Sequence, residues 1–207
     1  MKLHTRIAYN NACYQEGQKM KPKGIMIHST GANNPNLKRY VGPDDGILGK
    51  NIYDNHWNHA YPGGKAICCH AFIGKDKNGE IRTYQILPWQ MVGWHCGGKA
   101  NRTHISIEIC EDNTSDKHFS ETFEEAVQVA AYLCTLFGIN PQNIISHKEG
   151  HAKGLASNHG DPEHWWKKYN ITMEHFRKAV AKEMDSHKTY TMMIYDEKGE
   201  KNNELLQ

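Results

Sequence analysis

The alternation of apolar and polar residues along the chain predicts several short β-strands. Residues 24–28 form an apolar run that ends at a Ser-Thr-Gly turn. Residues 66–74 and 81–87 are rich in β-forming residues and flank an Asn-Gly pair, which is typical of a hairpin. Residues 104–110 alternate strictly, and residues 143–146 form a last apolar run. These segments together predict a sheet.

The strand expected at residues 104–110 has two chemically different faces. Successive side chains of a strand point to opposite sides, so its isoleucines share one face and its other residues share the second. The first face carries Ile105, Ile107 and Ile109, and the second carries Ser106, Glu108 and Cys110. We expect the isoleucine face to pack in the core.

Helical periodicity appears in the second half of the chain. Residues 120–138 begin at Ser120 in a capping-box pattern and end at a glycine, which predicts an amphipathic helix. Residues 172–184 predict a final helix with Thr172 as its N-cap. A short helix is also expected at residues 52–58, inside a Gly-, Pro-, Asn- and Asp-rich stretch that is otherwise typical of loop.

The order of these elements predicts the α/β class, with a central mixed β-sheet flanked by helices. We expect one catalytic domain over residues 1–185. Residues 186–207 are polar and charged, and we expect them to form a tail or the start of a linker.

Composition narrows the classes of partner. The formal net charge of +2 argues against nucleic-acid binding, which usually shows a basic stripe. No apolar run approaches the roughly 18 residues of a membrane span, so we expect no membrane insertion. The N-terminal residues lack the apolar region of a signal peptide, so we expect synthesis in the cytoplasm. The six cysteines are then expected to be reduced and mostly buried.

Histidine is the residue type in excess, with 14 copies in the chain. His28 and His147 each follow a strand that is expected to be buried, and Asp161 lies on a glycine-rich loop. Strand ends hold side chains rigidly, as a metal site requires, and the glycines let the loop fold back. Two imidazoles and a carboxylate are normal ligands of catalytic zinc. The pattern favours one zinc ion per chain.

Other interpretations of the histidines stay open at this point. A histidine at a strand end also serves as a hydrogen-bond partner of backbone carbonyl groups, without any metal. "HKEGH" at residues 147–151 fits neither zincin motif, because its acid occupies the third place. "HWNH" at residues 56–59 has an i,i+3 spacing that suits a metal on a helix, but no rigid third ligand is evident nearby.

Four blocks of the sequence together resemble one known family. They are "GIMIHST", "CCHAFIGKDKNGEIRTYQILPWQMVGWHCGG", "THISIEICED" and "SHKEGHAKGLASNHGDPEHWW". Over about residues 5 to 182 they look like the zinc-dependent type-2 N-acetylmuramoyl-L-alanine amidases, which are related to peptidoglycan recognition proteins and common among phage endolysins and autolysins. The resemblance implies a mixed sheet flanked by helices, with zinc in a surface groove.

The resemblance also implies roles for individual residues. His28, His147 and Asp161 match the family's zinc ligands. Glu108 matches the acidic residue that many members use to handle the attacking water; its structural alternative is a water-exposed carboxylate on an edge strand. His159 occupies the place where many members carry lysine, which implies a hydrogen bond to the oxyanion.

Several further positions take their interpretation from the same resemblance. "GWHCGG" is similar to a segment that lines the substrate groove, here through Trp94 and His95. Cys69 stands where some relatives have tyrosine, so a tyrosine-assisted mechanism is not expected. His70 is interpreted as a structural residue or a support of the metal ligands, and the tryptophans at 165–166 as packing under the loop.

The expected function is zinc-dependent hydrolysis of the amide bond between N-acetylmuramic acid and L-alanine in bacterial peptidoglycan. Glu108 is expected to take the proton of the attacking water and pass it to the leaving amine. The alternatives are a non-catalytic peptidoglycan-binding module and a metallopeptidase that cuts within the stem peptide. Peptidoglycan is the expected partner, reached after release from the cytoplasm, with the help of a holin if the chain is a phage lysin.

Overall fold

The structure, a computed structural model, describes residues 1–186 and contains a six-stranded sheet in the order β1-β4-β3-β5-β2-β6. Only β3 and β4 pair antiparallel; the other neighbouring strands are parallel. The sheet is therefore mixed, which confirms the expected fold class. The strands are β1 (Leu3–Thr5), β2 (Gly24–Asn33), β3 (Ala71–Lys75), β4 (Ile81–Gln85), β5 (His104–Glu111) and β6 (Ile144–Ser146).

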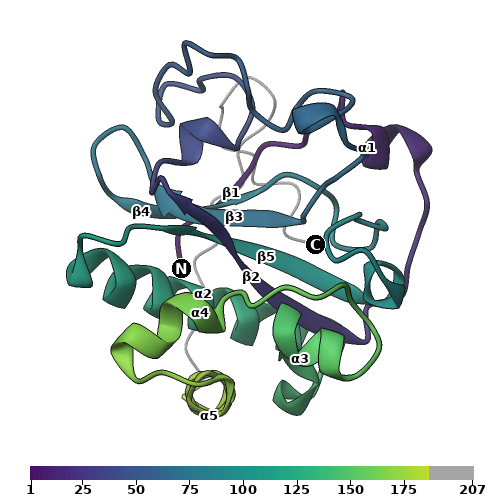
Figure 1. Ribbon diagram of the computed structural model, residues 1–207, viewed down its shortest axis with the longest axis vertical. Helices are drawn as coiled ribbons and strands as arrows, with labels where there is room; N and C mark the ends of the chain where they lie inside the picture. The colour runs from purple at the N-terminus through teal and green to yellow at the C-terminus, as the bar shows by residue number, and fades with distance from the viewer. Residues whose placement is uncertain (187–207) are drawn as a thin grey trace.

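Helices cover the sheet unevenly. In Figure 1, α2, α4 and α5 lie on one side of the sheet, and α1 with the long N-terminal loops lies on the other. The helices are α1 (Ala12–Glu16), α2 (Asp116–Phe137), α3 (His147–Ala152), α4 (Glu163–Trp166) and α5 (Met173–Asp185). Short 3₁₀ turns occur at Leu37–Arg39, Pro62–Gly64, Lys99–Arg102, Pro141–Asn143 and Lys167–Tyr169.

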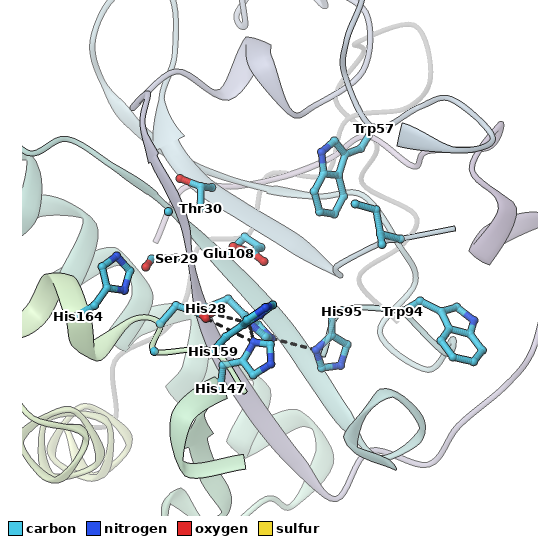
Figure 2. Close-up of a pocket in the computed structure, with 14 residues that line it drawn as sticks. His28, Ser29, Thr30, Trp57, Trp94, His95, Glu108, His147, His159 and His164 are labelled. Carbon is cyan, nitrogen blue, oxygen red and sulfur yellow. Dashed lines mark hydrogen bonds and ion pairs between the residues drawn. The ribbon is translucent and has the colours of Figure 1, made fainter. Parts of the chain in front are cut away.

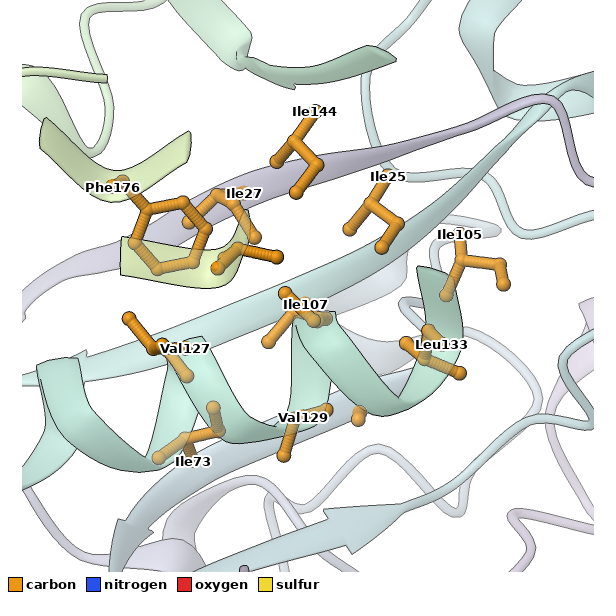
Figure 3. Packing of buried hydrophobic residues seen from close by; sticks show 14 of the residues in the cluster. Ile25, Ile27, Ile73, Ile105, Ile107, Val127, Val129, Leu133, Ile144 and Phe176 are labelled. Carbon is orange, nitrogen blue, oxygen red and sulfur yellow. The ribbon is translucent and has the colours of Figure 1, made fainter. Parts of the chain in front are cut away.

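The main hydrophobic core lies between the sheet and the α2–α5 pair. The isoleucine face of β5 packs in it, as the alternation of the sequence predicts. Its members include Ile25, Ile27, Ile105, Ile107, Ile109, Val129, Leu133 and Phe176 (Figure 3). Burying one such side chain contributes about 1.5–3 kcal/mol to folding, so this layer holds α2 and α5 against the sheet.

The opposite face of the same strands carries the polar residues. His28 of β2 is in register with Glu108 of β5, one position after the buried pair Ile27 and Ile107. Because side chains alternate along a strand, His28 and Glu108 both point away from α2. The sheet thus separates a packing face from a face that can hold a site.

The start of α2 differs from the sequence-based prediction. The helix begins at Asp116, and Ser115 is its N-cap, with a hydroxyl that accepts the His118 N–H at 3.1 Å. The prediction of a cap at Ser120 was wrong because Ser115 offers the same capping chemistry earlier, and Phe119 already packs in the core. The C-terminal end at Gly138, in the left-handed conformation, is as predicted.

The helix predicted at residues 52–58 is not formed. The segment consists of turns and bends, with Asn51 accepting the backbone N–H of Tyr53 at 3.1 Å and Asp54 in the left-handed region at φ 47°. Asn and Asp side chains compete for backbone groups in this way and divert the chain from a helix. The segment nevertheless contributes Trp57 to the lining of a pocket.

The bounds of two strands also differ from the sequence-based prediction. β2 continues to Asn33, beyond the predicted 24–28, and β3 starts only at Ala71 instead of residue 66. The backbone N–H of Cys68 donates to the Trp94 carbonyl at 3.1 Å, which ties this stretch to a loop and not to a strand. The β3–β4 hairpin and the Thr172 cap of α5 are confirmed. β1 and α1 were not predicted.

The structure also bears on the cysteines, the paired tryptophans, the membrane expectation and the tail. All six cysteines are unpaired and buried, and their burial is as expected. Trp165 and Trp166 are fully buried against Phe119, Phe123 and Phe176, as expected. Within residues 1–186 no helix has the length and apolar character needed to cross a bilayer. The tail expected at residues 186–207 lies, apart from its first residue, outside the described part of the chain.

The core generates a stability prediction. We expect Ile107→Ala to lower the free energy of unfolding by about 2–5 kcal/mol, because it leaves a cavity between β5 and α2. Leu136→Ala, at a side chain of α2 that is 51% exposed, is the control and should change it by less than about 0.5 kcal/mol. Urea unfolding followed by circular dichroism measures both. Equal effects of the two substitutions would contradict the assignment of the core.

Candidate metal centre

Two histidines and one aspartate meet at the polar face of the sheet, although they are far apart in the sequence. His28 Nδ1 lies 2.9 Å from Asp161 Oδ2, and His147 Nδ1 lies 3.4 Å from Asp161 Oδ1. The two Nδ1 atoms are 3.2 Å apart. The structure therefore brings together all three residues that the sequence analysis proposed as metal ligands. Figure 2 shows the two histidines, His28 and His147, next to each other.

Each of the three is held by backbone structure. His147 is the first residue of α3, directly after β6, and Ser146 caps this helix in a reciprocal capping box with Glu149. The His147 backbone N–H donates to the Asp161 carbonyl at 3.1 Å, which fixes the returning loop beside the helix start. Gly150 is needed for close packing, because a Cβ there would lie 2.7 Å from Met26 Cε.

The pKa shifts of Asp161 and His28 suit a cation at this point. Burial would raise the pKa of Asp161, but the two neighbouring histidines, His147 and His28, hold the pKa of this carboxyl far below its usual range. Burial lowers the pKa of His28, which favours a neutral imidazole. A carboxylate and two imidazoles within 4.8 Å of one another match the ligand chemistry of a divalent ion such as zinc.

Glu108 stands beside this group on β5. Its carboxylate lines the pocket, and Oε2 is buried without a hydrogen-bond partner among the described residues. Burial, reinforced by the nearby carboxylates of Asp161 and Glu111, raises its pKa well above the usual value. The alternative of an edge-strand carboxylate is excluded, because β5 lies between β3 and β2. A perturbed carboxyl in a pocket is a candidate acid–base group.

The surrounding pocket has a volume of about 470 Å³. His159 lines it, with its ring centroid 4.7 Å from that of His147. Trp94 lines it as well and is 38% exposed, in keeping with a wall that a ligand can touch. His95 lines it too, but its Nδ1 lies 2.9 Å from His28 Nε2. Figure 2 shows His95 directed toward His28, with Trp94 farther out.

Two residues of the apolar wall of the pocket were not found from the sequence. Trp57 and Ile67 line it together with Trp94. Asn11, fully buried, brings them there by donating from Nδ2 to the backbone carbonyls of both Trp57 and Ile67, at 3.0 Å each. No local pattern around Trp57 signals this position, since it depends on a residue 46 positions earlier.

Other histidines are accounted for by hydrogen bonds. His70 is fully buried, with Nδ1 2.9 Å from Ser106 Oγ and Nε2 2.8 Å from the Met91 carbonyl, which agrees with a structural role. Burial lowers its pKa to about 4. His164, at the pocket rim, pairs with the buried Glu111 at 2.9 Å.

A second group of possible ligands occurs at Asp54, His56 and His59. Here three of the four ring nitrogens already have hydrogen-bond partners within the loop. His56 Nδ1 accepts the Asn58 N–H at 3.2 Å, so its proton is on Nε2, 2.9 Å from Asp54 Oδ1. His59 Nε2 lies 2.8 Å from the Asp54 carbonyl. This group therefore forms a hydrogen-bonded clasp in the loop, and the His28 group is the better metal site.

An α/β domain with two imidazoles and two carboxylates around a surface pocket has the features of a metal-dependent hydrolase. Comparison with known families agrees with this class. The family described as N-acetylmuramoyl-L-alanine amidase (Amidase_2) matches residues 18–164, more than half of the chain. The chain belongs to this family.

Individual relatives are more distant. The chain is 35% identical over 72 residues to the N-acetylmuramoyl-L-alanine amidase XlyA of Bacillus subtilis (strain 168). This match covers 33% of this chain and 24% of XlyA. The chain is 30% identical over 73 residues to CwlA of Bacillus sp, covering 33% and 29%. The matches thus span less than a third of these curated relatives. The solved PlyG catalytic domain has the same fold, with a TM-score of 0.62 at 19% identity, covering 92% of this chain and 100% of that chain.

The geometry predicts where a metal ion binds. We expect Asp161→Asn to weaken Zn²⁺ binding by more than the roughly 10–100-fold loss typical of residues that only support a ligand, because it removes the anionic donor. Chelator competition with purified protein measures the affinity. The matched control is Asp54→Asn in the loop clasp, which should leave the affinity unchanged. Loss of binding in the control alone would move the ion to the clasp.

Proposed function

We propose that this chain is a zinc-dependent amidase that hydrolyses the bond between the lactyl carbonyl of N-acetylmuramic acid and the nitrogen of L-alanine in peptidoglycan. Family membership supports the reaction, and the observation that carries the metal is the convergence of His28, His147 and Asp161 on one point of the pocket. These three residues would hold one Zn²⁺ per chain. When bound, zinc polarises a carbonyl group and lowers the pKa of a bound water molecule.

Glu108 is the proposed acid–base residue. Its carboxylate accepts a proton from the water that attacks the lactyl carbonyl and delivers that proton to the L-alanine nitrogen as the C–N bond breaks. Its burial supports this role, because a carboxyl group with a raised pKa both accepts and returns a proton near neutral pH. Its position beside His28 in the β2–β5 register, with its side chain lining the same pocket, supports this role further.

His159 is the proposed donor to the developing oxyanion. It lines the pocket next to His147 and is reachable from solvent, so its ring can turn an N–H toward a bound carbonyl oxygen. One such donor is typically worth about 10²–10³ in rate. A histidine here, where many relatives have lysine, supplies this hydrogen bond without requiring a permanent charge.

The apolar wall is the proposed contact surface for the substrate. Trp94 and Trp57 line the pocket, and the Arg102 guanidinium carbon lies over the Trp94 ring, 6.0 Å from its centroid. Rings in such positions pack against the apolar faces of sugars and peptides. His95 also belongs to the proposed substrate site because it lines the pocket, and its Nδ1 contacts His28 as well.

The cellular setting follows from the substrate. Peptidoglycan is the proposed partner, so the chain acts at the bacterial cell wall, as an endolysin released with the help of a holin or as an autolysin. We propose residues 1–185 as the catalytic domain, with residues 186–207 as a tail or linker. The net charge of +2 gives little attraction for nucleic acid.

Mass spectrometry of digested peptidoglycan tests the reaction. We expect stem peptides with free L-alanine amino termini, in amounts that fall to background when a chelator removes the metal. New ends within the stem peptide would identify a peptidase instead. Binding to purified walls with no released product would identify the alternative, a peptidoglycan-binding module.

A substitution at Glu108 tests the acid–base step. We expect Glu108→Gln to lower kcat by about 10²–10⁴, because the amide keeps the shape but carries no transferable proton. Zn²⁺ affinity should stay within about twofold of the wild type. Glu124→Gln, at an exposed carboxylate of α2, is the control and should keep full activity. Wild-type turnover in Glu108→Gln would remove this residue from the mechanism.

A further inference from the structure

Both metal-facing imidazoles are supported by one short piece of chain, residues 94–98 ("WHCGG"). His95 Nδ1 lies 2.9 Å from His28 Nε2. On the other side, the Cys96 carbonyl accepts the Ser157 hydroxyl at 3.0 Å, and Ser157 Oγ lies 3.2 Å from His147 Nε2. Each imidazole therefore has its distal nitrogen tied to this segment, directly or through one hydroxyl.

The hydrogen bonds at Ser157 define the proton position on His147. A serine hydroxyl has one proton, and here it goes to the Cys96 carbonyl. Ser157 Oγ can then only accept from His147, so the His147 ring proton is on Nε2. The remaining nitrogen, Nδ1, then carries the lone pair and is the atom that faces His28 and Asp161.

His28 has a comparable contact on the opposite side, which permits the same proton position. Its Nδ1 faces Asp161 and His147, and its Nε2 faces His95. For Nδ1 to present a lone pair, the ring proton must be on Nε2. His95 Nδ1 lies 2.9 Å away and can accept that proton when the His95 ring proton is on its own Nε2.

The supporting segment is itself rigid. Asn101 Oδ1 accepts the backbone N–H groups of both His95 and Cys96 at 2.9 Å. At Gly98 the chain runs so close to residues 155–156 that a Cβ would lie 2.3 Å from the Leu155 carbonyl oxygen. A segment anchored in this way holds the His95 ring and the Cys96 carbonyl at a constant distance from each other.

We propose that His95 and Ser157 are positioning residues that place the ring protons of His28 and His147 on Nε2, and thereby present both Nδ1 atoms to a divalent metal ion. This proposal rests on the metal centre of the proposed function. It gives His95 a role toward a metal ligand in addition to lining the pocket. It also gives Ser157, which the sequence analysis did not select, a defined function. Partners of metal-bound histidines typically contribute about 10–100-fold to metal affinity.

Paired substitutions in the full chain separate the hydrogen bonds from packing. His95→Leu removes the acceptor, whereas His95→Asn keeps an oxygen close to the position of Nδ1. Ser157→Ala removes the hydroxyl between His147 and the Cys96 carbonyl. Thr135→Ala is the control, because it deletes a hydroxyl on α2, on the opposite side of the sheet. Each purified protein is titrated with Zn²⁺ against a chelator, and the absorption spectrum of its Co²⁺ form is recorded.

We expect about 10–100-fold weaker Zn²⁺ binding in His95→Leu and Ser157→Ala, together with an altered Co²⁺ spectrum. In His95→Asn and Thr135→Ala, the Zn²⁺ affinity should stay within about threefold of the wild type. Wild-type affinity in both His95→Leu and Ser157→Ala would overturn the proposal. Equal loss in His95→Leu and His95→Asn would overturn it for His95, because the hydrogen bond would then not be the cause.

A measurement on the unmodified chain covers the case of a variant that does not fold. Nitrogen-15 NMR of the histidine rings in the Zn²⁺-loaded wild type should show protonated Nε2 at both His28 and His147; protonated Nδ1 at either would overturn the proposal. A wild-type chain that takes up no Zn²⁺ would instead overturn the metal centre of the proposed function, and this inference with it. Normal zinc uptake without amide cleavage would overturn the proposed reaction alone and leave the positioning roles supported.

Discussion

His28 Nδ1 and His147 Nδ1 face each other at 3.2 Å, with the Asp161 carboxylate against both. In the tautomers proposed above, the two nitrogen lone pairs and the anion would repel one another unless a positive charge lay among them. The rest of the site is arranged around this requirement. The pKa values of Asp161 and His28 both lie below their usual ranges, which favours an anionic carboxylate beside a neutral imidazole.

The sheet makes this arrangement possible, because its packing residues and its site residues lie on opposite faces. One face of β2 and β5 carries isoleucines that pack under α2, and the residues between them face the pocket. A rigid, well-packed layer thus lies directly behind His28 and Glu108. Side chains of neighbouring strands keep their spacing with little freedom, which is what a metal centre and an adjacent acid–base group both require.

The loops contribute the parts of the site that the sheet does not. Residues 94–98 reach both imidazoles, and the turn-rich segment around Trp57 closes the apolar side of the pocket. Both are held by buried asparagines: Asn101 binds the backbone of the first, and Asn11 binds that of the second. A buried amide side chain replaces regular secondary structure as the means of fixing these segments.

Local patterns in the sequence were sufficient for the α/β class, the isoleucine face of β5, the hairpin, and the cap of α5. They also singled out His28, His147 and Asp161, because strand ends and glycine-rich turns are written in consecutive residues. Where two local signals competed, as at Ser115 and Ser120, the sequence alone did not decide between them, and contact of Phe119 with the core did.

Only the tertiary structure decided the internal position of β5, the wall formed by Trp57 and Ile67, and the contacts of His95 and Ser157. Each of these depends on atoms that are distant along the chain. The proton position on an imidazole, for example, is set by whichever group faces its other nitrogen, and no spacing within the sequence encodes that neighbour. Residue types and periodicity thus determined which groups were present, and packing determined which of them meet.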